Sequence, residues 1–337
     1  MDKSSLRVIN FHVIWMILFH GSYFLRVTAF NVARRNPRLY ASSSESFLIQ
    51  RRNYHHRGCI LDSSTSGAND IVIDRYRLAQ DLIVGMASKK TWKRFSGVYE
   101  LATRDSDSSC TCVDVGCDHG LLTIAFAMGG CFKRVVGIDI SERALHDGAL
   151  ANLDKIMSLS DRLPTSVSAS FPSNLDFEVG DGIKNLKEKE ACTVCICGVG
   201  VNTMDDILFS GEQAEESFRY KRLVLQPTNS RPRNLITLYD KIQNKGYVVL
   251  DEHMVYLSKR FYITTSFIER PYNQQNKSQN VLPGEIIMKN SNKESDNYKT
   301  WKAFVSFHLD WLEREKKLNP HQINQSDQRW LDFFGKL

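Results

Sequence analysis

Outside its first 61 residues the sequence lacks any excess of positive charge. The chain of 337 residues has a net charge of +6, but residues 1–29 contribute +2 and residues 30–61 contribute +5, which leaves −1 for the remainder. Overall charge therefore gives no argument for nucleic-acid binding, and any contact with RNA must rest on local clusters. Such clusters occur at Lys89, Lys90, Lys93 and Arg94, at Arg231 and Arg233, and at Lys259 and Arg260. Each is equally compatible with a solvated protein face.

Two further signatures are missing. No second Cys-x-x-Cys pair accompanies Cys192 and Cys195, so four metal ligands are not available and no metal site is expected. Cys112, Cys195 and Cys197 fall in predicted buried strands, where free cysteine acts as a small hydrophobic residue, and no disulfide framework is expected. The glycine turn at residue 116 lacks the third glycine of G-x-G-x-x-G, which disfavours NAD binding.

The first 70 residues have the composition of a targeting leader. Residues 8–25 are mostly apolar and follow Lys3 and Arg7, and small residues precede Phe30, so residues 1–29 resemble a secretory signal. Residues 30–70 are rich in Arg and Ser, predict disorder and resemble a transit peptide. Such a two-part leader is typical of a plastid of secondary origin, such as an apicoplast. A membrane anchor, a secreted protein and a mitochondrial presequence are the alternatives, and once the leader is removed no stable membrane association is expected.

Residues 113–120 read Val-Asp-Val-Gly-Cys-Asp-His-Gly, and the helical pattern of residues 121–128 follows. This predicts a strand, a tight turn and a helix N-terminus. Gly116 and Gly120 would let a ligand approach the backbone, where free amides and the helix dipole favour a negative group. Asp114 and Asp118 would repel a phosphate, whereas an amino-acid ligand also offers an ammonium group. S-adenosylmethionine is such a ligand.

Two more acids follow predicted strands. Asp139 lies 23 residues after Gly116, at the end of the strand 134–140, where an acid suits a ribose diol. Asp181 follows the strand 175–179 and could accept the exocyclic amine of adenine. Because the carboxyl ends of parallel strands line one crevice, Asp114, Asp139 and Asp181 could contact one nucleoside. Individually, each could be a turn or capping residue.

The segments VDVGCDHGLLTI, GIDIS, VGDGI, CICGVG and RLVLQPT together resemble the bacterial TrmK-type tRNA (adenine-N1)-methyltransferases. The Asp118-His119 pair and Leu225-Gln226-Pro227 make the match specific, and it covers residues 76–270, with a weaker match in the tail. The resemblance implies a class I methyltransferase fold, S-adenosylmethionine as cofactor, tRNA as partner and methylation of N1 of adenine 22. A methyltransferase of this fold with another substrate and a non-catalytic RNA-binding protein are the alternatives.

The resemblance also implies roles for individual residues. Asp118 would stabilise the methylated base or accept its proton, and His119 would orient Asp118 or contact the base, although either residue could instead cap the helix. Where the family has asparagine after Gln-Pro this chain has Thr228, with Asn229 one position later as a further catalytic candidate. The expected cofactor contacts are Asp114, Gly116, Gly120, Asp139, Ile140, Asp181, Gly182 and Gly198. The expected substrate contacts are Asn202, Arg231 and Arg233.

The remaining pattern alternates strands and helices. Strands are predicted at residues 192–197 and 222–226, helices from a Thr203 cap and over residues 234–245, and an antiparallel strand pair at residues 247–256 and 260–267. The predicted fold is α/β, a doubly wound and mostly parallel sheet with an antiparallel last strand, over residues 71–270. Residues 271–297 read as a polar linker. Residues 298–337 predict a helical tail whose apolar stripe either packs on the domain or belongs to an RNA-gripping arm.

Overall fold

The computed structural model describes residues 26–28, 75–106, 109–159, 171–184, 186, 191–210, 220–228, 231–270 and 280–336. Of the first 74 residues only Arg26–Thr28 is described, as a short strand, so the predicted signal and transit segments otherwise lie outside the described residues and stay predictions. Within the described residues, no helix combines the length and apolar character needed to span a bilayer.

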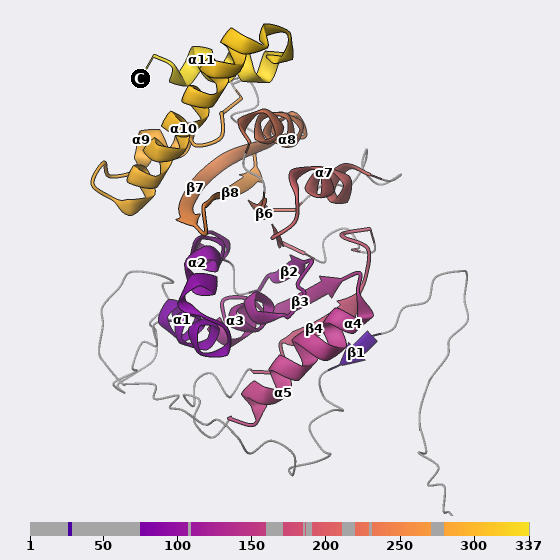
Figure 1. The fold of residues 1–337 in the computed structure, drawn as a ribbon. Coiled ribbons are helices and arrows are strands. Elements are labelled where there is room, and N and C mark those ends of the chain that lie inside the picture. Colours follow the sequence, from indigo (N-terminus) through magenta and orange to yellow (C-terminus); the bar gives the residue numbers. More distant parts are fainter. Residues whose placement is uncertain are drawn as a thin grey trace, which may run out of the picture.

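The core of the fold is a sheet of eight strands in the order β1-β4-β3-β2-β5-β6-β8-β7 (Figure 1). The five strands from β4 to β6 are parallel, and β8 runs antiparallel to both of its neighbours. The strands are β1 (Arg26–Thr28), β2 (Thr111–Val115), β3 (Arg134–Asp139), β4 (Leu175–Val179), β5 (Thr193–Cys197), β6 (Arg222–Gln226), β7 (Tyr247–Leu257) and β8 (Arg260–Glu269). The predicted parallel sheet with an antiparallel last strand is confirmed. Edge strand β1 pairs antiparallel with β4.

Helices cover both faces of the sheet because alternate strand residues point to opposite sides. Cys112 and Cys195 belong to one core, and their neighbours Val113 and Ile196 belong to the other. The first face packs against α1 (Arg75–Met86), α2 (Lys89–Thr103), α3 (Leu121–Gly129) and a composite helix of α4 (Glu142–Ala144), a π-helical segment η2 (Leu145–Leu150) and α5 (Ala151–Met157). The second packs against α7 (Val201–Phe209), α8 (Pro232–Asn244), α9 (Glu285–Asn290), α10 (Asp296–Leu318) and α11 (Gln325–Phe334).

The linker predicted over residues 271–297 is wrong for its second part. Residues 285–290 form α9, and Ile287 is buried in the core. Glu252 of β7 holds this segment, because its carboxylate accepts hydrogen bonds from the backbone amides of Gly284 (2.8 Å) and Ile286 (3.0 Å). The polar composition of the segment hid this attachment, since the acceptor that orders it lies more than 30 residues away in the sequence.

The tail is helical, as predicted, and its apolar stripe packs on the domain. Trp301, Phe304 and Leu312 of α10 are buried against the second core. His308 lies in the same stripe, and burial lowers its pKa to about 4, so it is neutral at pH 7. Figure 1 shows α9, α10 and α11 gathered beside β7 and α8. The buried stripe therefore serves folding, and any contact with RNA must use other surfaces of the tail.

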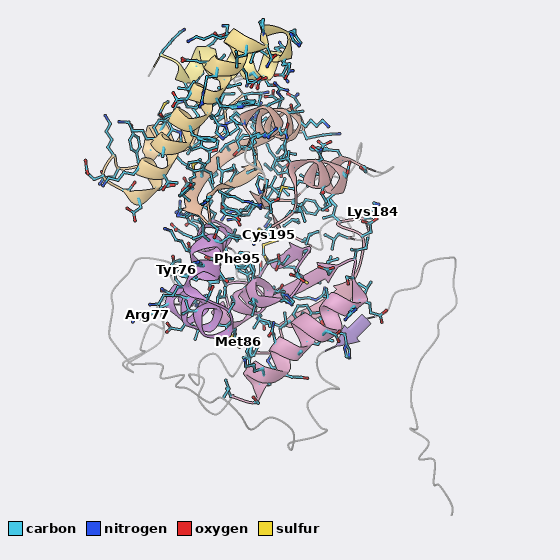
Figure 2. The ribbon with its side chains drawn as sticks, in the orientation of Figure 1. Tyr76, Arg77, Met86, Phe95, Lys184 and Cys195 are labelled. Carbon is cyan, nitrogen blue, oxygen red and sulfur yellow. A yellow bond between two sulfur atoms is a disulfide. The ribbon has the colours of Figure 1, made fainter. Side chains whose placement is uncertain are left out.

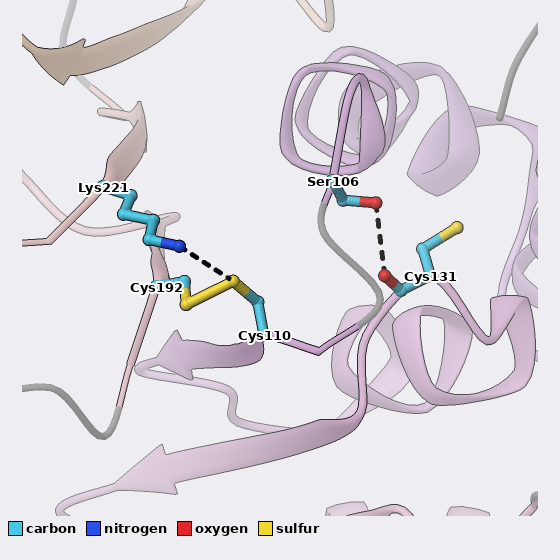
Figure 3. Close-up of a disulfide and its surroundings, with 5 residues drawn as sticks. All are labelled: Ser106, Cys110, Cys131, Cys192 and Lys221. Carbon is cyan, nitrogen blue, oxygen red and sulfur yellow. Dashed lines mark hydrogen bonds between the residues drawn. A yellow bond between two sulfur atoms is a disulfide. The ribbon is translucent and has the colours of Figure 1, made fainter. Parts of the chain in front are cut away.

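A disulfide joins Cys110 and Cys192, although no disulfide was expected (Figure 3). Cys112, Cys195 and Cys197 are free and buried, as predicted. Cys110 and Cys192 precede β2 and β5, which are paired in parallel, and their Cα atoms are 5.5 Å apart. Lys221 Nζ lies 3.9 Å from Cys110 Sγ. The bond was missed because 82 residues separate the two cysteines and only the pairing of the strands brings them together. It lies at the amino ends of β2 and β5, at the opposite edge of the sheet from the carboxyl ends of the strands.

Candidate functional site

The turns that follow β2, β3, β4 and β5 meet at one edge of the sheet. The turn after β2 is attached to β3, because the amides of Gly116 and Cys117 donate to the carbonyl oxygen of Ile138 (2.8 and 3.1 Å). The turn after β4 is attached in the same way, since Gly180 N donates to the oxygen of Asp139 (2.9 Å). The predicted crevice at the carboxyl ends of the strands is therefore built from linked turns.

Gly116 and Gly120 both adopt left-handed φ angles, 71° and 66°, but for different purposes. A Cβ on Gly120 would lie 2.7 Å from Ala149 Cβ and 2.9 Å from the Phe177 ring, so this glycine permits close packing. A Cβ on Gly116 would meet only Val199 Cγ1, at 3.8 Å. Gly116 thus faces room for a ligand, and its amide-rich turn lies at the N-terminal end of α3.

Asp114 lies beneath this turn and is buried, with 3% of its surface exposed. Its Oδ2 accepts a hydrogen bond from Thr123 Oγ1 of α3 at 2.7 Å. Burial raises the pKa of Asp114 to about 7, and the nearby charge of Asp139 adds to the increase. The structure therefore places the first predicted acid under the crevice floor, where a cationic group above it would favour its ionised form.

Asp139 organises the neighbouring turns. Its two carboxylate oxygens accept hydrogen bonds from the backbone amides of Asp118 and Ser141, each at 2.9 Å. Each oxygen keeps a further lone pair, so the group can still accept a hydroxyl of a ribose. Ile140 beside it is 71% exposed, an unusual exposure for a large apolar residue. Such a side chain at a crevice suits contact with the face of a nucleobase.

Asp118 and His119 lie at the mouth of the crevice. Asp118 has a left-handed φ of 49°, and its Oδ2 is 3.7 Å from His119 Nε2, with both side chains about two-thirds exposed. The carbonyl oxygen of His119 accepts a hydrogen bond from Asn152 Nδ2 at 2.9 Å. A Cβ on Gly148 of the π-helical segment would lie 2.6 Å from His119 Nδ1. Gly148 thus makes room for the histidine, a role that no sequence pattern revealed, and π-helical segments of this kind are frequent at functional sites.

Asp181 and Gly182 follow β4. Asp181 is exposed and forms an ion pair with Lys184 in the same loop. Figure 2 shows Lys184 on the segment that follows β4 and precedes β5. Gly182 has a φ of 64°, and a Cβ there would lie 3.1 Å from Ile207 of α7. The acid at the third strand end is therefore present at the crevice, but it already has a cationic partner.

The opposite side of the crevice contains Arg94, which was predicted only as part of a basic surface cluster. Arg94 of α2 lies over Gly198, whose φ is 83° and whose Cβ, if present, would be 2.4 Å from Arg94 Nη2. The Arg94 guanidinium is 5.6 Å from the Tyr262 ring. Buried Gln226 fixes this arrangement by donating from Nε2 to the Arg94 carbonyl and to Thr264 Oγ1, both at 2.8 Å. The Gln of Leu-Gln-Pro therefore links α2, β6 and β8.

The predicted substrate-binding residues lie on two different helices, α7 and α8. Asn202 is exposed in the first turn of α7, which is capped by Gly200, so the predicted cap at Thr203 is wrong. Arg231 is exposed at the start of α8, with its guanidinium 6.0 Å from the Trp311 ring. Asn229 lies outside the described residues.

Arg233 has a structural partner that was not predicted, and its role in substrate binding stays a prediction. Its guanidinium forms an ion pair with Asp327, which is 1% exposed, and donates to the Gln322 carbonyl at 2.7 Å. A buried carboxylate requires such a partner, so Arg233 attaches α11 to α8. In the described part of the chain, no group of three His, Cys, Asp or Glu side chains could hold a metal ion.

A methyltransferase domain model matches residues 93–264, which is more than half of the chain. Similar solved structures include the tRNA methyltransferase TrmK of B. subtilis, with 16% identity over 72% of this chain and 94% of that one and a TM-score of 0.49. TrmK of M. capricolum with S-adenosyl-homocysteine gives 17% identity, coverage of 71% and 92%, and a TM-score of 0.46. A Streptococcus agalactiae protein of the NADB-Rossmann superfamily has 18% identity over 70% of this chain and 92% of that one, with a TM-score of 0.49. No curated protein matches.

Proposed function

Because this chain belongs to the methyltransferase domain family, we propose that it transfers the methyl group of S-adenosylmethionine to N1 of an adenine in tRNA. The observation that carries the proposal is the exposed Asp118-His119 pair, which lies beside the open space above Gly116. The same pair follows the glycine turn in the motif that resembles the TrmK-type enzymes, and that resemblance makes adenine 22 the expected target.

The crevice fits S-adenosylmethionine, the cofactor of this methyltransferase. Gly116 leaves room for the amino-acid part beside the amides at the start of α3. Asp139 retains acceptor capacity for the ribose, and exposed Ile140 offers an apolar contact to adenine. Asp114 beneath the turn provides the negative charge that the ammonium group requires. When bound, the cofactor supplies an electrophilic methyl carbon on a sulfonium.

The side chains at the crevice mouth determine what happens to the accepting base. The lone pair of adenine N1 forms the new bond to carbon as the carbon–sulfur bond breaks, so the positive charge moves from sulfur to the base. The carboxylate of Asp118 can stabilise that charge, or accept a proton from the exocyclic amine. His119, whose Nε2 lies 3.7 Å from Asp118 Oδ2, either orients the carboxylate or contacts the base. An adenine inside folded tRNA must first be unstacked, which costs a few kcal/mol.

Methyl transfer with tritiated S-adenosylmethionine into unmodified tRNA tests the proposal, followed by primer extension to map the position. The expected product is tRNA with a tritiated methyl group on N1 of an adenine. Asp118→Ala should lower the rate about 100- to 1000-fold with little change in affinity for S-adenosylhomocysteine. Asp154→Ala, an exposed acid on α5, is the matched control and should behave as the wild type. An unchanged rate in the Asp118 variant would remove this residue from the mechanism.

Two outcomes would favour the other candidates. Cofactor binding without transfer to any tRNA, together with transfer to a protein or a small molecule, would indicate a methyltransferase of the same fold with another substrate. Failure to bind S-adenosylhomocysteine, together with retained RNA binding, would indicate a non-catalytic RNA-binding protein.

We also propose that the leader directs the protein to a plastid of secondary origin. The support is the apolar residues 8–25 followed by the Arg- and Ser-rich residues 30–61. A fusion of residues 1–70 to a fluorescent protein should enter that plastid in a host that has one. Accumulation in mitochondria or in the secretory pathway would overturn the assignment.

A further inference from the structure

A groove of about 1340 Å³ lies between the β7–β8 hairpin, α2 and the first half of α10. Its charged lining is mostly cationic, and Asp296 is the acidic residue among the described lining side chains. We call it the basic groove; its cations are Lys93, Arg231, Lys259, Arg260 and Lys299. Lys299 Nζ lies 3.3 Å from a Glu294 carboxylate oxygen, whereas Lys93, Lys259 and Arg260 are exposed and have no described carboxylate partner. Such a concentration of positive charge favours an anionic ligand.

Aromatic rings lie among these cations. Tyr256 and Phe307 are 49% and 56% exposed, and both line the basic groove. Phe261 lies between them, with ring centroids 4.7 Å from Tyr256 and 6.2 Å from Phe307. Exposed rings beside cations form the combination that binds unpaired nucleic acid, because the cations neutralise phosphates and the rings stack on bases. Small anions would use the cations alone.

The basic groove adjoins the methyl-transfer crevice. In the antiparallel register of β8 with β6, Thr264 lies opposite Gln226, the last residue of β6, so residues 260–263 continue past the end of β6 for about 13 Å. Thr228 lines the basic groove, and its amide donates to the oxygen of Val199, which in turn faces Gly116. A single strand of nucleic acid lying in the basic groove would therefore lead toward the crevice.

The hairpin tip keeps a cation where the backbone favours glycine. Ser258 and Lys259 both have left-handed φ angles, 50° and 63°, as a two-residue turn of this hand requires. Glycine or asparagine would adopt this conformation more easily. The lysine at this position therefore has no conformational advantage, and its side chain lines the basic groove.

We propose that the basic groove binds the single-stranded or unstacked part of the RNA next to the methylated adenine. Lys93, Lys259 and Arg260 contact phosphates, and one base stacks on the Tyr256 and Phe307 rings. This inference rests on the proposed tRNA substrate and names the surface that holds it. A concave groove lined by rings suits a single strand better than the flat surface of a membrane.

The test uses the full chain and an unmodified tRNA transcript, with affinity measured by fluorescence anisotropy at several salt concentrations. Lys259→Gly combined with Arg260→Ser should weaken tRNA binding about tenfold at moderate salt and lower the slope of log K against log salt by about 1.5. The change to glycine keeps the turn conformation accessible. Lys133→Ser combined with Lys155→Ser removes the same charge from exposed positions elsewhere, before β3 and on α5, and is the matched control.

The aromatic side chains are tested separately. Phe307→Ser should weaken tRNA binding about tenfold without changing the salt slope, because stacking does not release counterions. Affinity for S-adenosylhomocysteine should be unchanged in every variant, which also shows that each one folds. If the groove variants bind tRNA as the control does, the proposal is overturned. Tighter binding to phosphatidylserine vesicles than to tRNA, lost in the same variants, would overturn it in favour of a lipid surface.

Failure of the proposed reaction would give a different result. If no tRNA is methylated but the groove variants still bind tRNA more weakly than the control pair, the groove assignment stands and the catalytic assignment fails. If tRNA is methylated and all variants bind tRNA and react equally, the catalytic assignment stands and the groove assignment fails.

Discussion

Asp114 and Glu252 are buried carboxyl groups in the two halves of the molecule, and their surroundings differ. Burial raises the pKa of both to about 7. Glu252 accepts hydrogen bonds from Tyr239 Oη, Gly284 N and Ile286 N, all from fixed positions in the protein. Asp114 accepts hydrogen bonds from the hydroxyl and the backbone amide of one residue, Thr123, and lies under the glycine turn. A raised pKa alone therefore does not identify a functional acid; the hydrogen-bond donors around it do.

The largest effect expected from this comparison is on stability. Glu252→Ala leaves the backbone amides of Gly284 and Ile286 without their acceptor in the interior, whereas the Tyr239 hydroxyl keeps its hydrogen bond with Thr265. We expect the free energy of unfolding to fall by about 3 kcal/mol and the melting temperature by roughly 5–10 °C. Calorimetry or denaturant unfolding measures both.

The control for this prediction is the cofactor affinity of the folded variant. At 15 °C, below the lowered transition, Glu252→Ala should keep its affinity for S-adenosylhomocysteine, because Glu252 is not in the crevice. A loss of cofactor affinity with unchanged stability would exchange the roles assigned to the two acids.

The next effect is on cofactor affinity and its pH dependence. If the Asp114 carboxylate faces the ammonium group, the affinity for S-adenosylhomocysteine should rise about tenfold from pH 6 to pH 8, as the group with a pKa of about 7 loses its proton. Asp114→Asn should bind about tenfold more weakly at pH 8 and show no such rise. Isothermal titration calorimetry at several pH values makes the measurement.

As pH rises, the stability of the wild-type protein should fall while its cofactor affinity increases. The pKa of Asp114 is higher in the folded protein than its ordinary value of 3.8, so the folded state binds more protons between those values and loses stability as pH rises toward 7. Asp114→Asn removes this loss, so at pH 8 the variant should be at least as stable as the wild type. Lower stability at pH 8 with unchanged cofactor affinity would make Asp114 a structural acid like Glu252.

The two halves also differ in how far the sequence predicted them. Strand and helix positions, the glycine turn and the acids at the strand ends follow local patterns, since the parallel arrangement brings successive strand ends together. The contacts that attach the C-terminal half do not follow local patterns. Arg233 and Asp327 lie 94 positions apart in the sequence, and Glu252 and Gly284 lie 32 positions apart. Residues in such pairs look like surface cations or linker glycines in the sequence.

The same reasoning explains what the sequence missed within the site. Arg94 belongs to a run of basic residues that suggested a solvated face, yet Gln226 holds it over Gly198. Only the packing of α2 on β6 and β8 distinguishes Arg94 from its neighbour Lys93, which is exposed in the basic groove.

The smallest effect expected is on His119, through Gly148, which packs against it. Gly148→Ala would place a Cβ 2.6 Å from His119 Nδ1 and 3.2 Å from His119 Cα, so the ring must move and the turn must shift by a few tenths of an ångström, although alanine itself favours a helix. We expect kcat for tRNA methylation to fall about fivefold while stability and affinity for S-adenosylhomocysteine stay constant. His119→Ala alone and combined with Gly148→Ala completes a double-mutant cycle. If Gly148 acts through His119, the second substitution adds no loss in the His119→Ala background, whereas an additive loss would mean that Gly148 affects the turn independently of the histidine.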